Sequence, residues 1–328
     1  MITVGQIGVG YWGPNLLRNL NFNDDCNVKT VADLSKDRRE FVEKSYPNVF
    51  VTDDVNNIFN DQDIDAVIIS TPASTHYDLA IRSLNSNKHI LVEKPMATTS
   101  EEVKHIKELS SKKELVAMVG HTFLYNSAVR CVKSIIDSGE IGNVRYIYSQ
   151  RLNLGRIRND IDALWNLAPH DISIIQYLLD EIEPVSVSRS GQSYVQDGID
   201  DVVFLNLAYP NKVIANIHVS WLDPQKTRKM VIVGSKKMII YDDIADNKVI
   251  VYNKGIDRMS ILGENMDFDS HNNFNYREGK CYYPDFVWEE PLKNEINHFL
   301  KCINNSETCL TDCLHAEKVI NILNKKYV

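Results

Sequence analysis

Hydrophobic positions along the chain follow two different patterns, and the change falls near residue 122. Before that point, short apolar runs alternate with longer segments whose apolar residues recur every three or four positions, as in strands that alternate with helices. We expect strands at residues 2–8, 27–33, 49–51, 65–71, 88–93 and 115–120, and helices between them, such as 74–87 and 100–112. This order predicts an α/β domain over residues 1–122, a Rossmann-type doubly wound parallel sheet.

Beyond residue 122 the apolar positions follow a period of two, most clearly at residues 213–221. Strands are expected at 144–154, 201–209, 213–221, 229–233, 237–242 and 248–252, and helices at 128–137, 168–179, 291–304 and 312–325. Short separations between the strands favour an α+β domain with an open-faced mixed or antiparallel sheet and helices on one side. We assign residues 123–328 to this second domain, for substrate binding and oligomerisation, and interpret the polar segment 255–285 as a functional or mobile loop.

Charge and composition exclude several classes of protein. The net charge is −8 and there is no run of basic residues, so we expect no nucleic-acid partner. The sequence contains neither an apolar stretch of the ~20 residues that a membrane span needs nor the pattern of a signal peptide, so we expect a cytoplasmic protein with no membrane partner. Its six cysteines lack the spacing of a metal site and are interpreted as buried free thiols, with no metal expected.

A glycine-rich segment joins the first predicted strand to the first predicted helix, and it reads Gly-Val-Gly-Tyr-Trp-Gly over residues 8–13. Gly8 allows a tight turn, Gly10 lets backbone amides approach a pyrophosphate, and Gly13 allows close packing of helix on strand. The N-terminus of the helix then faces the anion. This arrangement predicts a dinucleotide site.

The residues around this segment indicate which dinucleotide binds. Asp33 ends the second strand, where a carboxylate can accept hydrogen bonds from ribose hydroxyls and would repel a 2′-phosphate, which favours NAD. Arg38 and Lys36 lie close by and keep NADP open as the alternative. Tyr11 and Trp12 either form a wall of the nicotinamide pocket or pack as ordinary aromatic side chains.

Three further motifs carry a resemblance to a known family. They are Ser70-Thr71-Pro72 with His76, Glu93-Lys94-Pro95, and the segment 165–171, Trp-Asn-Leu-Ala-Pro-His-Asp. With the glycine segment, they make the chain resemble the glucose–fructose oxidoreductase / inositol dehydrogenase (Gfo/Idh/MocA) family over nearly its whole length. The resemblance implies a Rossmann domain followed by an open-faced sheet domain, and an NAD(P)-dependent oxidoreductase that acts on CH–OH groups.

The resemblance also implies two catalytic residues, Lys94 and His170. Oxidation of a secondary alcohol needs a hydride acceptor, a base for the hydroxyl proton and a positive group near the developing alkoxide. NAD supplies the first, His170 the second and the Lys94 ammonium the third. The family usually has an aspartate four positions before this histidine, whereas this chain has Asn166, which we interpret as a substrate-orienting residue. The alternatives are a surface lysine for Lys94 and a core or helix-capping histidine for His170.

Other cofactor contacts implied by the resemblance are Thr71, Pro72 and His76, although His76 could equally begin a helix. Glu93 either holds the nicotinamide-side ribose or orients Lys94. Pro95 is a candidate for a cis peptide that turns Lys94 into the cleft.

Substrate contacts are expected at Lys94, Tyr125, Arg151, Asn153, Asn166 and His170. Arginines 151, 156 and 158 suit an anionic group distant from the reacting carbon. Segments 121–126 and 165–171 resemble nucleotide-sugar 3-dehydrogenases, which implies oxidation at C3 of a nucleotide sugar such as UDP-N-acetylglucosamine or its uronic acid. A free polyol or sugar of the inositol type, a non-catalytic NAD(P)-sensing regulator and a hydride-initiated glycosidase remain as alternatives. An open sheet face must be covered, so we expect a homodimer or homotetramer.

Overall fold

A computed structural model describes residues 1–155, 157–159, 161–258 and 274–325, which divide into two compact units. The first unit comprises Met1–Asn126 and Glu289–Asn324, and the second is built on Ser127–Trp288. Sequence analysis placed the boundary after residue 122 and assigned the last two helices to the second domain. The structure divides the chain after Asn126 and places both of those helices in the first unit.

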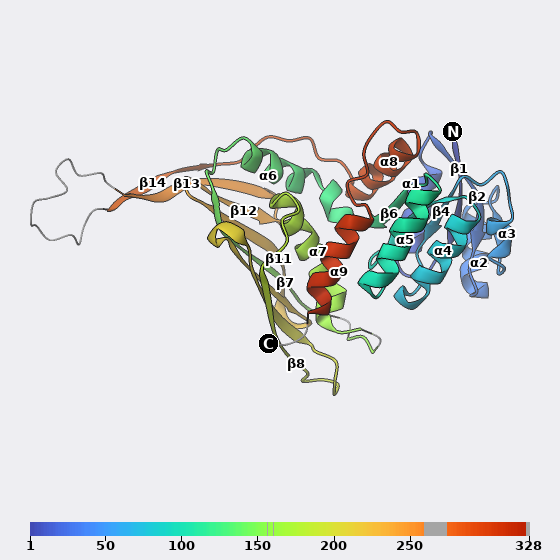
Figure 1. Ribbon diagram of the computed structural model, residues 1–328, viewed down its shortest axis with the longest axis horizontal. Helices are drawn as coiled ribbons and strands as arrows, with labels where there is room; N and C mark the ends of the chain where they lie inside the picture. Colours follow the sequence, from blue (N-terminus) through green and yellow to red (C-terminus); the bar gives the residue numbers. More distant parts are fainter. Residues whose placement is uncertain (156, 160, 259–273, 326–328) are drawn as a thin grey trace, which may run out of the picture. The chain divides into compact units, whose positions relative to one another are not determined.

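The first unit is built on a six-stranded sheet in which every pairing is parallel, with the strand order β3-β2-β1-β4-β5-β6 (Figure 1). Its strands are β1 (Ile2–Ile7), β2 (Cys26–Ala32), β3 (Phe50–Thr52), β4 (Ala66–Ile69), β5 (His89–Glu93) and β6 (Ala117–Gly120). Between them lie α1 (Gly13–Asn21), α2 (Lys36–Ser45), α3 (Asn56–Phe59), η1 (Ala73–Thr75), α4 (His76–Asn85) and α5 (Ser100–Lys112), and η2 (Thr122–Tyr125) follows β6. This confirms the doubly wound domain. Its strand order reverses between β1 and β4, where such sheets bind ligands.

The two C-terminal helices complete this unit. Helix α8 (Pro291–Ile303) packs on α1 and η2, and α9 (Cys313–Asn324) packs on α5 and β6. Each presents an apolar side to the Rossmann core, with Phe299 and Ile296 on α8 fully buried. The sequence pattern shows that such a helix is amphipathic, but not which sheet it covers, since both units offer an apolar face.

The second unit contains an eight-stranded sheet with the order β14-β13-β12-β11-β7-β10-β9-β8. β7 and β10 pair in parallel and the other neighbours are antiparallel, which confirms the mixed sheet. The strands are β7 (Val144–Leu154), β8 (Ser186–Gln192), β9 (Val202–Ala208), β10 (Ile214–Ser220), β11 (Leu222–Gly234), β12 (Met238–Asp242), β13 (Val249–Arg258) and β14 (Phe274–Tyr282). Helices α6 (Ser127–Asp137) and α7 (Ala163–Leu178) pack on one face, and η3 (Pro210–Lys212) joins β9 to β10.

Two strands of this sheet were missed by the sequence analysis. β8 is rich in serine, and β14 exposes nearly every residue, so neither shows the apolar alternation that reveals a strand. β14 falls in the segment 255–285, which was interpreted as a loop. There the described residues form a hairpin of β13 and β14 that reaches beyond the neighbouring strands (Figure 1), while 259–273 lie outside the described residues.

Helix α7 begins at Ala163 rather than near residue 168. Asp162 explains the earlier start, because its side chain accepts a hydrogen bond of 2.8 Å from the Trp165 amide and so caps the helix. Pro169 then lies inside the helix. Among the described residues, none of the helices combines the length and the apolar character that a membrane span would need.

Candidate functional site

The glycine segment after β1 has the geometry that a dinucleotide loop requires. Gly8 has a φ of +92°, and a Cβ atom there would lie 2.7 Å from the Ser70 carbonyl oxygen. A Cβ on Gly13 would lie 2.6 Å from the Gly8 carbonyl oxygen, whereas a Cβ on Gly10 would meet nothing within 4 Å. The protein's own backbone therefore requires glycine at two positions, and the third leaves open space beside the N-terminus of α1. These residues fit the pyrophosphate of NAD.

Asp33 lies at the end of β2 and is tied to this loop. Its Oδ2 accepts a hydrogen bond of 2.6 Å from the Val9 amide, and its Oδ1 accepts one of 2.8 Å from the Ser35 amide. The residue is half-buried. Each carboxylate oxygen has a further lone pair that could accept from a ribose hydroxyl. The position therefore fits the role expected for Asp33 and adds a second role, holding the glycine loop.

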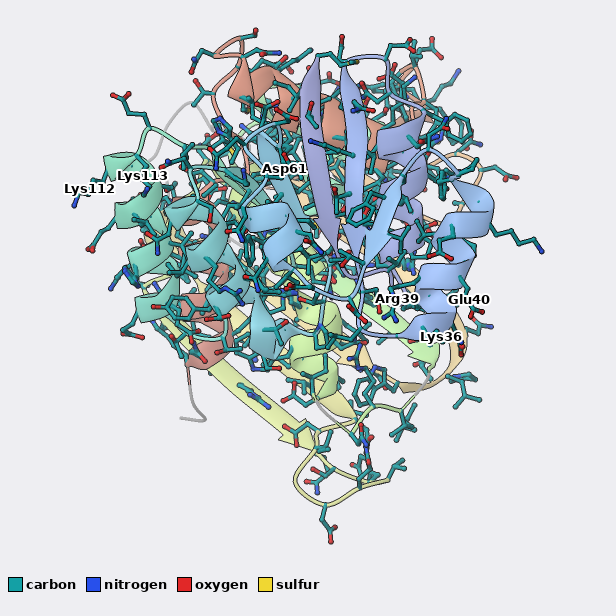
Figure 2. All side chains as sticks on the ribbon, turned by 90° about the vertical axis from the view of Figure 1, so that its right-hand side faces the viewer. Lys36, Arg39, Glu40, Asp61, Lys112 and Lys113 are labelled. Atoms are coloured by element: carbon teal, nitrogen blue, oxygen red, sulfur yellow. The ribbon has the colours of Figure 1, made fainter. Side chains whose placement is uncertain are left out.

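The basic residue brought to Asp33 is Arg39 rather than Arg38. Arg39 donates to the Asp33 and Leu34 carbonyl oxygens at 2.8 and 2.9 Å, whereas Arg38 is exposed. Figure 2 shows Arg39 grouped with Lys36 and Glu40 on α2. The sequence analysis selected Arg38 because it lies close to Asp33 along the chain. In the structure, the first turn of α2 determines which arginine side chain points back to the end of β2.

Lys94 follows the last residue of β5, at the edge of the sheet where β1 and β4 also end. The Lys94 amide donates to Oε2 of Glu93 at 3.2 Å, and the Lys94–Pro95 peptide is cis, as the sequence suggested. Burial raises the pKa of Glu93 to about 7, against the opposing effect of the Lys94 ammonium and a hydrogen bond from the Trp12 side chain. Glu93 is thus placed to orient Lys94, one of the two roles considered.

His76 begins α4 and is buried beneath these loops. Its Nδ1 lies 2.7 Å from the Pro95 carbonyl oxygen and its Nε2 lies 2.8 Å from that of Thr71. Thr71 also shares a hydrogen bond of 2.7 Å with Thr75, through their hydroxyl groups, just after Pro72. The His76 side chain is buried, so it offers no surface for a direct contact with the cofactor. The structure therefore corrects the expectation for His76, which links the loop after β4 to the segment after Lys94.

A buried acidic residue that sequence reasoning missed lies near Glu93. Glu295 on α8 is fully buried, and its Oε2 accepts a hydrogen bond of 2.9 Å from the Thr122 hydroxyl. Burial, reinforced by the charge of Glu93, holds the pKa of Glu295 well above its usual range. The remaining oxygens, Oε1 of Glu93 and Oε1 of Glu295, are both buried without a hydrogen-bond partner. No sequence signal pointed to Glu295, because α8 had been assigned to the other domain.

The aromatic candidates of the first unit differ sharply in exposure. Tyr11 is 91% exposed and Trp12 is 38% exposed, so both side chains can meet a ligand at the glycine loop. Tyr125 is fully buried, and its hydroxyl lies 2.9 Å from that of Thr311. This placement corrects the expectation that Tyr125 contacts substrate, since its hydroxyl is used inside the core.

In the second unit, α7 carries both Asn166 and His170. They are four positions apart on one helix and therefore share a face. The Trp221 indole donates to Oδ1 of Asn166 at 3.3 Å, and both Asn166 and His170 are half-buried. The geometry allows Asn166 to be oriented from the sheet and to present its amide group beside His170.

The arginine cluster predicted from the sequence is divided by the structure. Arg151 is buried, and its Nε and NH2 atoms donate to Asp171 at 2.6 and 3.5 Å. Burial alone would lower the pKa of Arg151, but the Asp171 carboxylate raises it. Arg151 is therefore an internal ion-pair residue, which corrects its assignment as an anion anchor. Arg158 is exposed, Asn153 is half-buried, and Arg156 lies outside the described residues.

Two family models match the chain in succession. Residues 2–121 match a model described as an oxidoreductase family with an NAD-binding Rossmann fold, and residues 129–240 match the GFO/IDH/MocA C-terminal domain. The first match covers all six strands of the first unit's sheet, and the second covers β7 to β11 and the start of β12 in the second unit.

Individual relatives show the same similarity. The scyllo-inositol 2-dehydrogenase (NAD(+)) of Bacillus subtilis is 25% identical over 96% of this chain and 89% of its own length. The inositol 2-dehydrogenase of Salmonella typhimurium is 28% identical over 55% of each chain. Several relatives are matched over only 55% to 61% of their own length. Among solved structures, a UDP-N-acetylglucosamine 3-dehydrogenase of Acidithiobacillus ferrooxidans has the same fold, with a TM-score of 0.78, 23% identity and coverage of 98% of this chain and 95% of that one.

Proposed function

We propose, on the premise that this chain belongs to the Gfo/Idh/MocA family of oxidoreductases, that it is an NAD-dependent dehydrogenase acting on a secondary alcohol of a sugar. The observation that carries the proposal is the position of Lys94. It follows β5 at the edge of the sheet where the glycine loop also lies. A cation at that edge would stabilise negative charge that develops on an alcohol oxygen.

The residues that would hold NAD lie on the first unit. The glycine loop and the N-terminus of α1 would hold the pyrophosphate, and Asp33 would accept from the adenosine ribose. Glu93, at the end of β5, and Thr71 and Pro72, just after β4, would contact the nicotinamide side of the cofactor. When bound, NAD supplies the acceptor for the hydride of the alcohol carbon.

Two side chains of this protein would handle the alcohol's proton and oxygen. The Lys94 ammonium would donate a hydrogen bond to the alcohol oxygen and favour its alkoxide form. The neutral imidazole of His170 would accept the hydroxyl proton, and Asn166 on the same face of α7 would orient the substrate by hydrogen bonds. A non-catalytic NAD sensor would need neither Lys94 nor His170.

Within the sugar class, we propose that the substrate is a nucleotide sugar oxidised at C3, of the UDP-N-acetylglucosamine type. The support is the resemblance of segments 121–126 and 165–171 to nucleotide-sugar 3-dehydrogenases, together with the exposed Arg158, which can meet a phosphate. The second candidate is a free polyol. It is favoured by the two inositol dehydrogenases that this chain resembles.

We also propose that two copies associate through the open face of the second unit's sheet. Tyr146, Tyr148, Phe204 and Ile214 are each between 37% and 57% exposed. Tyr146 pairs with Ile214 across β7 and β10, so these side chains share one face. α6 and α7 pack on the opposite face. An apolar face of this kind is costly to leave in water, and a second copy covers it symmetrically.

A substrate panel tests the proposed function. The purified protein is incubated with NAD and, separately, UDP-N-acetylglucosamine, its uronic acid and myo-inositol, and NADH formation is followed by absorbance. The proposal expects turnover with a nucleotide sugar and its loss in Lys94→Ala. Turnover with inositol alone would establish the second candidate. NAD binding without turnover of any sugar or polyol would contradict a dehydrogenase.

A further inference from the structure

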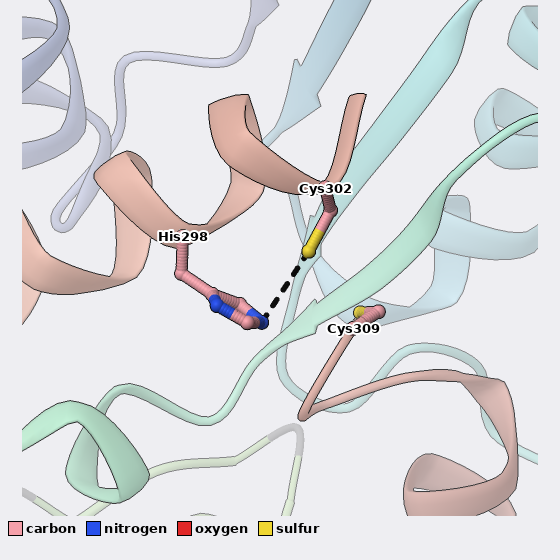
Figure 3. Close-up of side chains that lie close together, drawn as sticks. All are labelled: His298, Cys302 and Cys309. Atoms are coloured by element: carbon pink, nitrogen blue, oxygen red, sulfur yellow. Dashed lines mark hydrogen bonds between the residues drawn. The ribbon is translucent and has the colours of Figure 1, made fainter. Parts of the chain in front are cut away.

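Three potential metal ligands meet in the first unit at the end of α8, apart from the residues assigned to the cofactor. They are His298, Cys302 and Cys309, and their ligand atoms all lie within 4.8 Å of one another (Figure 3). The sequence analysis interpreted all six cysteines as buried free thiols. In the structure α9 begins at Cys313, and Cys309 faces the end of α8.

The positions of the first two ligands follow from helix geometry. His298 and Cys302 are four residues apart on α8, so both side chains lie on the same face. Cys302 Sγ lies 3.4 Å from Nε2 of His298. A tetrahedral zinc ion with ordinary bond lengths holds sulfur and nitrogen ligands about 3.5 Å apart, so this pair already has the separation of one edge of such a site.

The imidazole of His298 is oriented as a zinc ligand usually is. Its Nδ1 lies 2.6 Å from Oε2 of Glu307, whose other oxygen accepts from Lys301 at 2.8 Å. A carboxylate on Nδ1 fixes the tautomer in which Nε2 carries the lone pair, and carboxylate–histidine–zinc arrangements use this contact. Nε2 now accepts a hydrogen bond of 3.0 Å from the Leu310 amide, so a bound cation would displace that donor.

Burial and accessibility also suit a metal ion. His298 and Cys302 are buried, whereas Cys309 is half-buried and follows an exposed segment, which leaves a path to solvent. All three cysteines near this end of the unit, Cys302, Cys309 and Cys313, are free thiols. Two thiols that bind Zn²⁺ release two protons, and the resulting pair of thiolates balances the charge of the ion.

We propose that His298, Cys302 and Cys309 form a binding site for a thiophilic divalent cation, with Zn²⁺ as the ion. Three protein ligands leave a fourth position for water. The site would join the end of α8 to the segment before α9. That segment carries Thr311, whose carbonyl oxygen accepts from the Val119 amide at 2.9 Å at the end of β6. Metal binding would therefore stabilise the attachment of α9 to the Rossmann sheet.

The test uses the intact protein, reduced, stripped of metal with a chelator and titrated with Co²⁺ and Zn²⁺. We expect one Co²⁺ per chain with a thiolate-to-cobalt absorption band, its displacement by Zn²⁺, and protection of two thiols from a thiol reagent. Zn²⁺ should raise the melting temperature of the wild-type protein. Absence of the cobalt band in the fully reduced protein would overturn the proposal, as would a Cys302–Cys309 disulfide that cannot be reduced without unfolding.

Variants assign the ligands. Cys309→Ser and His298→Ala should each weaken Zn²⁺ binding by about 100-fold or more, and Glu307→Gln should weaken it by about 10- to 100-fold. Cys131→Ser, which changes a half-buried cysteine of the second unit, is the matched control and should leave the affinity unchanged. The metal-binding result for Cys309→Ser counts only if the metal-free variant has the same melting temperature as the metal-free wild-type protein. If it does not, the metal affinity of Glu307→Gln decides. An unchanged metal affinity in Cys309→Ser or in Glu307→Gln would overturn the ligand assignment.

Discussion

The Val9 amide donates a hydrogen bond of 2.6 Å to Oδ2 of Asp33, so the carboxylate proposed to bind the cofactor ribose also holds the glycine loop. The two roles use different lone pairs and respond differently to substitution. Removing the side chain affects both roles. An amide of the same shape can still accept from Val9 through its oxygen, but it loses the negative charge, and its amino group cannot accept from the Ser35 amide.

Substitutions at Asp33 therefore separate the two roles. Asp33→Asn should weaken NAD binding by about tenfold or more, because hydrogen bonds to a charged acceptor contribute about 1.5–3 kcal/mol, and should reduce discrimination against NADP. Asp33→Ala should do the same and also lower the melting temperature of the unliganded protein. Both cofactors are titrated into each variant. An unchanged NAD affinity in both would exclude Asp33 from the site.

The buried pair Glu93 and Glu295 predicts how stability varies with pH. Both carboxyl groups have raised pKa values in the folded protein, mainly through burial, with Glu93 at about 7 against an ordinary value of 4.5. A raised pKa means that the folded state binds the proton more tightly. The stabilisation is therefore complete below pH 4.5 and is lost as the pH rises through about 7 and beyond.

Glu295→Gln should remove part of this dependence. We expect the free energy of unfolding of the variant to exceed that of the wild type at pH 8, by on the order of 1–3 kcal/mol, and to differ less at pH 5. Urea unfolding at both pH values measures this, with Glu43→Gln, an exposed glutamate on α2, as control. A variant less stable than the wild type at pH 8 would contradict the assignment.

Arg151 and Arg158 should give opposite phenotypes. Arg151→Ala leaves Asp171 buried without its partner and should cost about 3–5 kcal/mol of stability, measured by urea unfolding. Arg158→Ala should leave stability nearly unchanged and raise KM for a nucleotide sugar more than it lowers kcat, because an anchoring contact acts in the ground and transition states alike. Arg145→Ala, exposed on β7, is the control. Equal binding of free and nucleotide-linked sugars would exclude the anchor.

The oligomeric state should depend on the open face of the second unit's sheet. Light scattering at micromolar concentration should show a dimer or tetramer for the wild type, and Tyr148→Asp with Ile214→Asp should give single chains. Phe50→Asp changes a side chain that is 58% exposed on β3 of the first unit, and it should leave the assembly intact. A wild-type protein with the mass of one chain would contradict the proposal.

Much of the fold could be predicted from the sequence because it depends on local signals. Three patterns each reflect only the local surroundings of their own residues: the glycine segment, the apolar runs of the parallel strands and the alternation around residues 214–220. β14 could not be found in this way, because its residues are exposed on both faces.

Contacts between distant residues were not predictable from one sequence. Arg151 looked like an anion anchor until the structure placed Asp171 beside it. Glu295 and His298 had no assignment because nothing in the sequence shows that α8 returns to the first unit. The position of Lys94, by contrast, could be predicted, because Lys94 lies at the end of a strand and the local sequence shows where a strand ends.

The most direct test of the proposed dehydrogenase is the kinetics of Lys94→Ala and His170→Ala with the sugar substrate. Each should lower kcat by on the order of 100-fold or more, and the double variant should lose less than the product of the two losses, since both groups act on one hydroxyl. NAD affinity should stay within a few-fold of the wild type. His105→Ala, exposed on α5, is the control. Oxidation should also slow at low pH, where an imidazole is protonated and cannot act as the base. Near-normal turnover in His170→Ala, with NAD affinity intact, would contradict the account.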